Sequence, residues 1–155
     1  MDRDMIRFFR ANEKPYGVFS NLYRRLFEFD GRQFTTAEHA YQFGKARKPA
    51  VQEWLMNAPS PSLLAMAAHG LYSWDIIPGW SKNKTERMRK VVLAKFTQHD
   101  DLWKLLLSTG DAELVEVGSA DNAVNRFWGK IEYRGRLEGM NMLGKILMET
   151  REELL

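Results

Sequence analysis

Four short strings in this chain of 155 residues combine hydrogen-bonding side chains with aromatic rings and glycines. They lie at residues 17–23 (GVFSNLY), 35–42 (TTAEHAYQ), 127–129 (FWG) and 139–144 (GMNMLG). Aromatic rings stack on bases, and glycines let phosphates approach the backbone closely. The mixture is therefore typical of a pocket for a nucleotide-like ligand.

Other kinds of chemistry lack their signatures. The sequence contains no Walker loop, no G-x-G-x-x-G, no H-E-x-x-H and no G-x-S-x-G motif. It has 0 cysteines, which excludes thiolate catalysis and cysteine-based zinc sites. His39, His69 and His99 are too far apart for ligand spacing. We therefore expect no metal and no cofactor.

The second string marks the start of a helix. Thr35 and Glu38 fit a capping box, with Thr35 as N-cap and Glu38 at the third helical position. Helical spacing then places Glu38, Gln42 and Lys45 on one face. The pattern alone leaves two roles open for Glu38, completion of the cap or contact with a ligand. Just before it, Asp30-Gly31 between two apolar runs predicts a β-hairpin.

The remaining pattern predicts an α+β fold that is predominantly helical, with a short N-terminal hairpin and small strands. Strands are expected at residues 5–10, 114–117 and 127–133. Helices are expected from Pro49, at 61–69, 83–98 and 100–110, and at 141–155. Without a linker-like segment, residues 1–155 are expected to form one compact domain.

Charge and hydropathy narrow the setting. The formal net charge is +3 and the pI is about 9.2, which favours a phosphate-bearing partner only slightly. The N-terminus is charged, and no apolar run reaches the roughly 18 residues of a membrane span. We expect a cytoplasmic protein without membrane contact. The basic stretch 82–95 suggests nucleic-acid binding, which Glu86 and the modest charge weaken.

With these motifs in order along almost the whole chain, the sequence resembles the NADAR superfamily. The matching pieces are Phe19-Ser20-Asn21, Tyr23, Asp30-Gly31, residues 34–42, Lys45-Ala46, Trp80, Arg87, Lys95-Phe96, Trp128-Gly129, Asn141 and Leu143-Gly144.

The resemblance implies an N-glycosidase that hydrolyses the C1–N bond between a phosphorylated ribose and a base. It implies as substrate a ribosylamino-pyrimidine phosphate of riboflavin synthesis, or ADP-ribosylated guanine in nucleic acid. The transition state resembles an oxocarbenium ion and needs a carboxylate, for which Glu38 is the first candidate. Substrate contacts are expected from Phe19, Ser20, Asn21, Lys45, Trp80, Arg87, Trp128, Gly129 and Asn141. Ordinary core packing is the alternative for the two tryptophans.

One departure from the family pattern concerns a second carboxylate. Family members carry an aspartate three residues before the Trp-Gly pair, where this chain has Asn125, and Asp121 lies four residues upstream. An amide can position a ribose hydroxyl but cannot accept a proton. Either a short insertion moves the carboxylate to Asp121, or this chain has an amide in place of the acid. By its spacing to Trp128, we expect Asn125 to hold the position, with Glu38 carrying catalysis. The alternative is a non-catalytic module that binds ADP-ribose or another nucleotide.

Overall fold

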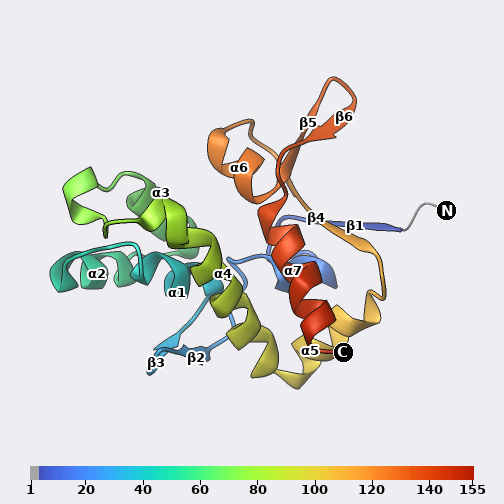
Figure 1. The fold of residues 1–155 in the computed structure, drawn as a ribbon, viewed down its shortest axis with the longest axis horizontal. Helices are drawn as coiled ribbons and strands as arrows, with labels where there is room; N and C mark the ends of the chain where they lie inside the picture. The colour runs from blue at the N-terminus through green and yellow to red at the C-terminus, as the bar shows by residue number, and fades with distance from the viewer. Residues whose placement is uncertain (1–3) are drawn as a thin grey trace. The chain divides into compact units, whose positions relative to one another are not determined.

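The computed structural model describes residues 4–155, and this part of the chain divides into two compact units. One unit is formed by residues 4–23 and 99–155, and the other by Arg24–Gln98. Helices outweigh strands in the described chain, so the predicted α+β, predominantly helical class is confirmed (Figure 1). No helix within residues 4–155 has the length and apolar character needed to cross a membrane.

The 24–98 unit begins with the predicted hairpin. Strand β2 (Phe27–Phe29) pairs antiparallel with β3 (Arg32–Phe34). Between them, Asp30 has a φ of 51° and Gly31 a φ of 77°, as a type I′ turn requires. The hairpin packs its phenylalanines on helix α1 (Ala37–Phe43) and on Val91.

Four further helical segments complete this unit. They are α2 (Pro49–Met56), α3 (Pro61–His69), the 3₁₀ turn η2 (Ser73–Asp75) and α4 (Trp80–Thr97). Both expected proline-initiated helices are present, and α4 begins three residues earlier than predicted. Helix α1 packs against α2, α3 and α4, which explains why six of its seven residues are buried (Figure 1).

The other unit is built on a four-stranded sheet in the order β1-β4-β5-β6. Strands β1 (Met5–Phe8), β4 (Glu113–Gly118) and β5 (Lys130–Tyr133) run parallel, and β6 (Arg136–Glu138) pairs antiparallel with β5. The 3₁₀ turn η1 (Tyr16–Phe19) packs on β1, and the helix α6 (Ala123–Trp128) packs on β4 and β5. The helix α5 (Asp100–Ser108) packs against α7 (Met142–Glu153). Helix α7 packs on β4 (Figure 1).

Two predicted strands in this unit are wrong by two residues or more at one end. The first strand ends at Phe8 rather than residue 10. The strand expected over residues 127–133 begins only at Lys130, because α6 continues through Trp128. The side chain of Asn122 accepts a hydrogen bond from the backbone N–H of Asn125 at 2.8 Å and caps this short helix. Its six residues are too few to show a helical period.

Candidate functional site

Helix α1 begins one residue later than its capping-box pattern suggested. The N-cap is Thr36, not Thr35, and its hydroxyl oxygen accepts a hydrogen bond from the backbone N–H of His39 at 3.0 Å. The same hydroxyl lies 2.6 Å from Nδ1 of the His39 ring. This one-residue shift moves Glu38 out of the third helical position. The reciprocal capping role that the sequence allowed for Glu38 is therefore wrong.

The Glu38 carboxylate has a side-chain partner instead. Its Oε1 accepts a hydrogen bond of 2.7 Å from Nε2 of Gln42, one helical turn further on. Glu38 is 9% exposed and Gln42 is 2% exposed. A carboxylate is costly to bury, and a single amide donor offsets only part of that cost.

The electrostatic setting of Glu38 follows from this burial. Loss of solvation raises the pKa of Glu38, while the Gln42 hydrogen bond and the positive charge of Lys45 act in the opposite direction. The pKa of the neighbouring Tyr41 is also raised, chiefly by burial and further by the Glu38 charge. Tyr41 therefore stays a phenol. A carboxylate with a raised pKa is a better proton acceptor than an exposed one.

Lys45 lies just beyond the end of α1 and is tied to α3. Its Nζ donates to the backbone oxygen of Ala68 at 2.7 Å. Burial lowers the pKa of Lys45, and the charge of Lys84 lowers it further, against the attraction of Glu38. Burial and the Lys45 charge likewise lower the pKa of His69. Lys45 is thus a half-buried cation whose charge favours the ionised form of Glu38.

Arg87 on α4 holds the end of α1. Its Nε donates to the carbonyl oxygens of Ala40 at 3.1 Å and Tyr41 at 3.2 Å, and Nη2 also donates to Ala40. Its Nη1 lies 3.9 Å from the Asp30 carboxylate. A cation satisfying the last carbonyls of a helix is stabilised by the helix dipole. The geometry gives Arg87 a structural task, and its contact with substrate phosphate stays a prediction.

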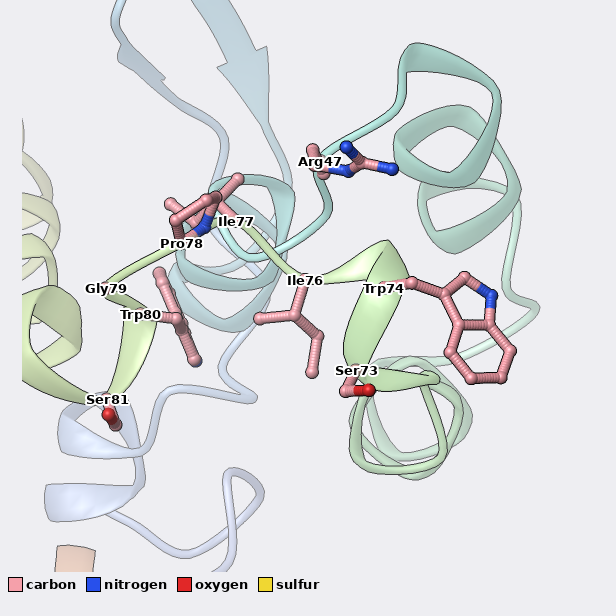
Figure 2. Close-up of a pocket in the computed structure, with 9 residues that line it drawn as sticks. All are labelled: Arg47, Ser73, Trp74, Ile76, Ile77, Pro78, Gly79, Trp80 and Ser81. Atoms are coloured by element: carbon pink, nitrogen blue, oxygen red, sulfur yellow. The ribbon is translucent and has the colours of Figure 1, made fainter.

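The ring of Trp80, at the first residue of α4, lies 4.9 Å from that of Tyr41. Trp80 also lines a hollow of about 530 Å³ together with Arg47, Trp74 and Ile76. Figure 2 shows Ile76 projecting between the two tryptophans. The lining is formed by residues 47 and 73–81, and Glu38 is not part of it. Of the predicted site residues, Glu38, Lys45, Trp80 and Arg87 thus gather around α1.

The other predicted residues belong to the 4–23 and 99–155 unit. Phe19 is fully buried, with its ring 5.7 Å from Phe8 and stacked at 5.6 Å on Tyr16. Ser20 is buried, and its Oγ accepts from the backbone N–H of Leu22 at 3.1 Å. These contacts shape the turn that carries the half-buried Asn21.

Asp121 and Asn125 have different surroundings. Asp121 is exposed, and its carboxylate receives two hydrogen bonds from Arg126, of 2.6 and 3.0 Å. These bonds lower the pKa of Asp121. Asn125 instead donates from Nδ2 to the carbonyl of Ala120 at 2.8 Å and packs so closely on Gly118 that a side chain there would collide with it. The helix α6 thereby holds Asn125 against β4.

The Trp-Gly pair and Asn141 hold α6 and α7 on the sheet. Any side chain at Gly129 would meet the carbonyl oxygen of Glu116, so the close approach requires glycine. The buried Asn141 donates from Nδ2 to the Leu114 carbonyl at 2.9 Å and accepts from the Glu116 N–H at 3.1 Å. Trp128 is half-buried, and its ring meets Phe127 edge-on at 4.8 Å.

The site predictions missed two residues that the structure associates with Glu38. Gln42 was expected only as a neighbour on the same helix face, and Tyr41 only as a member of the 35–42 string. The i, i+4 spacing of Glu38 and Gln42 was a usable signal, because such pairs meet on a helix. Within residues 4–155, no group of three or more His, Cys, Asp or Glu side chains is arranged to hold a metal ion.

The chain thus combines a mostly helical α+β fold with a buried carboxylate on a short, covered helix. Residues 7–155 match the model of the NADAR domain family. The chain belongs to this family.

Individual relatives agree over nearly the whole chain. N-glycosidase YbiA of Escherichia coli (strain K12) is 35% identical over 152 residues, which cover 98% of this chain and 90% of the relative. N-glycosidase Npun_R5314 of Nostoc punctiforme is 35% identical, covering 97% and 93%. Riboflavin biosynthesis protein VVA0006 of Vibrio vulnificus is 32% identical over 147 residues, which cover 95% of this chain and 38% of that longer protein.

Among solved structures, the NMR structure of the E. coli protein YbiA matches with a TM-score of 0.83 and 34% sequence identity. The match covers 99% of this chain and 86% of that one. Sequence and fold therefore indicate the same relationship.

Proposed function

We propose that this hydrolase of N-glycosyl compounds cleaves the C1–N bond between a phosphorylated ribose and a base, with Glu38 as the catalytic carboxylate. The observation that carries the proposal is the buried Glu38 on α1, which has one side-chain hydrogen bond and a raised pKa. Two relatives bear the name N-glycosidase, which supports the reaction class.

The hydrolysis requires a proton acceptor close to C1 of the ribose. As the C1–N bond breaks, positive charge develops on the ribose and the bond electrons go to the leaving nitrogen. A water oxygen forms the new bond to C1, and Glu38 takes the water proton. The proton that Glu38 takes passes on to the departing nitrogen, which regenerates the carboxylate, so the products are the free base and the phosphorylated ribose. A buried carboxylate stabilises developing positive charge strongly, because little solvent screens it.

The cations around α1 favour a substrate with phosphate. Lys84 is close enough to Lys45 for its charge to lower the pKa of Lys45, and Arg87 stands one turn further along α4. Cationic side chains of this kind bind phosphate through charge-assisted hydrogen bonds. In this proposal Lys45 is the first phosphate ligand, because its charge also acts on Glu38.

Two substrates fit the proposal, a ribosylamino-pyrimidine phosphate and ADP-ribosylated guanine in nucleic acid. The name of the Vibrio vulnificus relative, a riboflavin biosynthesis protein, supports the first. In both, a ribosyl C1–N bond lies near phosphate, so one arrangement of carboxylate and cations serves either. In this proposal the substrate meets no membrane and no cofactor is used.

The test is a substrate panel analysed by mass spectrometry in the presence of EDTA. It contains ribosylamino-pyrimidine phosphates, NAD, ADP-ribose and a DNA oligonucleotide carrying ADP-ribosylated guanine. Release of free base from at least one member, undiminished by the chelator, is the expected result. Binding of ADP-ribose without base release from any member would instead indicate the non-catalytic module that Asn125 suggests.

A further inference from the structure

The amide of Gln42 is a buried group whose bonding is incomplete. Its Nε2 donates to Glu38, while no described residue donates to its Oε1, which is also shielded from solvent. Gln42 is 2% exposed. A buried amide oxygen without a donor lowers the stability of a fold, and native structures contain few such groups.

This imbalance distinguishes Gln42 from a residue kept for packing. An apolar side chain of similar length, such as methionine, would fill the same space without stranding an oxygen. The interaction that stabilises the Gln42 amide is its hydrogen bond of 2.7 Å to the Glu38 carboxylate. A group retained at a cost to stability, and directed at one acid, is typical of functional sites.

We propose that Gln42 is the positioning residue of Glu38, an amide that fixes the orientation of the carboxylate and favours its ionised form within the α1 face. The inference rests on the proposed function of Glu38 and adds a residue to it. Gln42 acts through Glu38 and has no contact with the reacting atoms. Its direction of action is clear, since a donor to a carboxylate favours the charged state.

Other charges share the surroundings of Glu38. Lys45, just after α1, favours the charged carboxylate, and the phenol of Tyr41 on α1 is influenced by Glu38 in turn. The elements packed on α1 contribute further titratable or charged groups, namely Arg32 on β3, Glu53 on α2, His69 on α3, and Lys84 and Arg87 on α4, while His39 lies on α1 itself. Gln42 is the neutral partner among them. A substitution at Gln42 therefore changes the hydrogen bond to Glu38 without changing the net charge.

The test compares Gln42→Met with the matched control Gln52→Met. Gln52 on α2 also donates an amide hydrogen, but to the backbone oxygen of Phe43 at 3.0 Å. The pKa of Glu38 is measured by ¹³C NMR of its carboxyl carbon, alongside melting temperature and the pH profile of kcat. These three measurements separate positioning from packing, because a packing role affects stability and leaves the pKa in place.

In Gln42→Met we expect the pKa of Glu38 to rise by about one unit. The acidic limb of the kcat profile then moves to higher pH, turnover on that limb falls about tenfold, and the plateau at high pH recovers. KM is expected to stay unchanged. The melting temperature is expected to stay unchanged or to increase. Gln52→Met should leave the Glu38 pKa and the kcat profile unchanged.

An unchanged Glu38 pKa in Gln42→Met would overturn the inference, whatever happened to stability. The same holds if Gln42→Met melts well below wild type while its pH profile stays in place, because Gln42 would then be a packing residue. The NMR titration needs no turnover. If wild type released no base from any substrate, the proposed function would fail, and the Gln42–Glu38 coupling would still be measured.

Discussion

The α1 region and the segment from residue 121 to residue 141 differ in how many hydrogen-bond partners their polar side chains have. On α1, Glu38 is buried with one amide donor, and that amide leaves its own oxygen without a partner. In the 121–141 segment, Asp121 is exposed and bound twice by Arg126, and Asn141 is buried with both amide atoms bonded to the backbone of β4.

This difference supports the proposal that α1 carries the catalytic carboxylate. A carboxylate that accepts two hydrogen bonds from an arginine has its pKa lowered and is a weaker proton acceptor, as at Asp121. A buried carboxylate with few donors has its pKa raised, as at Glu38. The polar groups of the 121–141 segment hold α6 and α7 on the sheet. On α1, Glu38 keeps, among the described residues, only the Gln42 amide as a side-chain hydrogen-bond donor.

The largest expected effect is the loss of turnover in Glu38→Gln. The substitution keeps the volume of the side chain and removes its charge and its capacity to accept a proton. We expect kcat to fall at least about 100-fold, the usual scale for losing acid–base catalysis. The helix should remain intact, because its cap is Thr36. Far-UV circular dichroism beside the kinetic assay checks this, and near wild-type turnover would remove Glu38 from the mechanism.

A second prediction concerns the segment whose polar groups are fully bonded. Asn141→Ala leaves the Leu114 carbonyl and the Glu116 N–H without their amide partners, and it places alanine at a φ of 52°. We expect a loss of about 3 kcal/mol in the free energy of unfolding. Urea denaturation measures it, with the exposed Asn12→Ala as control. A loss no greater than that of the control would show that these bonds contribute little.

The elements of the chain differ in how far the sequence could predict them. The hairpin was predictable because Asp30 and Gly31 determine their own turn, and α2 and α3 because proline marks their first turns. The cap of α1 was misplaced because Thr35 and Thr36 offer the same hydroxyl. Only the final backbone shows which of the two binds His39.

The site was predictable as a set of residue types, and much less as a set of contacts. Glu38 lies on α1 and Lys45 lies just beyond its C-terminal end, so local spacing was enough to associate them. Arg87 reaches carbonyls 46 and 47 positions away in sequence, and Asn141 binds backbone 25 and 27 positions away. Such partners follow from tertiary packing, which no local pattern encodes. For Asn141, the sequence predicted a substrate contact, which stays a prediction, and the partners of its side chain in the structure are backbone groups of β4.

The third prediction uses pH to sharpen the contrast. The raised pKa of Glu38 means that the folded state binds more protons than the unfolded state between the ordinary and the raised pKa. Stability contributed by Glu38 therefore falls as pH rises through that window. Glu38→Gln lacks this dependence, so its melting temperature should exceed that of wild type above the window. The melting temperatures of the two proteins should converge at about pH 4, close to the ordinary carboxyl pKa. Parallel curves at every pH would mean that Glu38 is not destabilised by burial.

The smallest expected effect belongs to Asp121→Asn. The amide oxygen still accepts from Arg126, whose Nη1 also keeps its bond of 3.2 Å to Glu138. The lost charge faces solvent, where an ion pair contributes little. We expect kcat and KM to stay within about twofold of wild type, since surface changes away from the site are nearly neutral.

Asn125→Asp serves as the companion variant. This variant places a carboxylate at the position where family members carry their aspartate, and it removes the hydrogen bond from Nδ2 to Ala120. We therefore expect Asn125→Asp to change the rate, while Asp121→Asn does not. Loss of turnover in Asp121→Asn with the fold intact would reverse this order. The carboxylate tied to Arg126 would then be the reactive one, and the stability of an ion pair would no longer separate structural acids from catalytic acids in this protein.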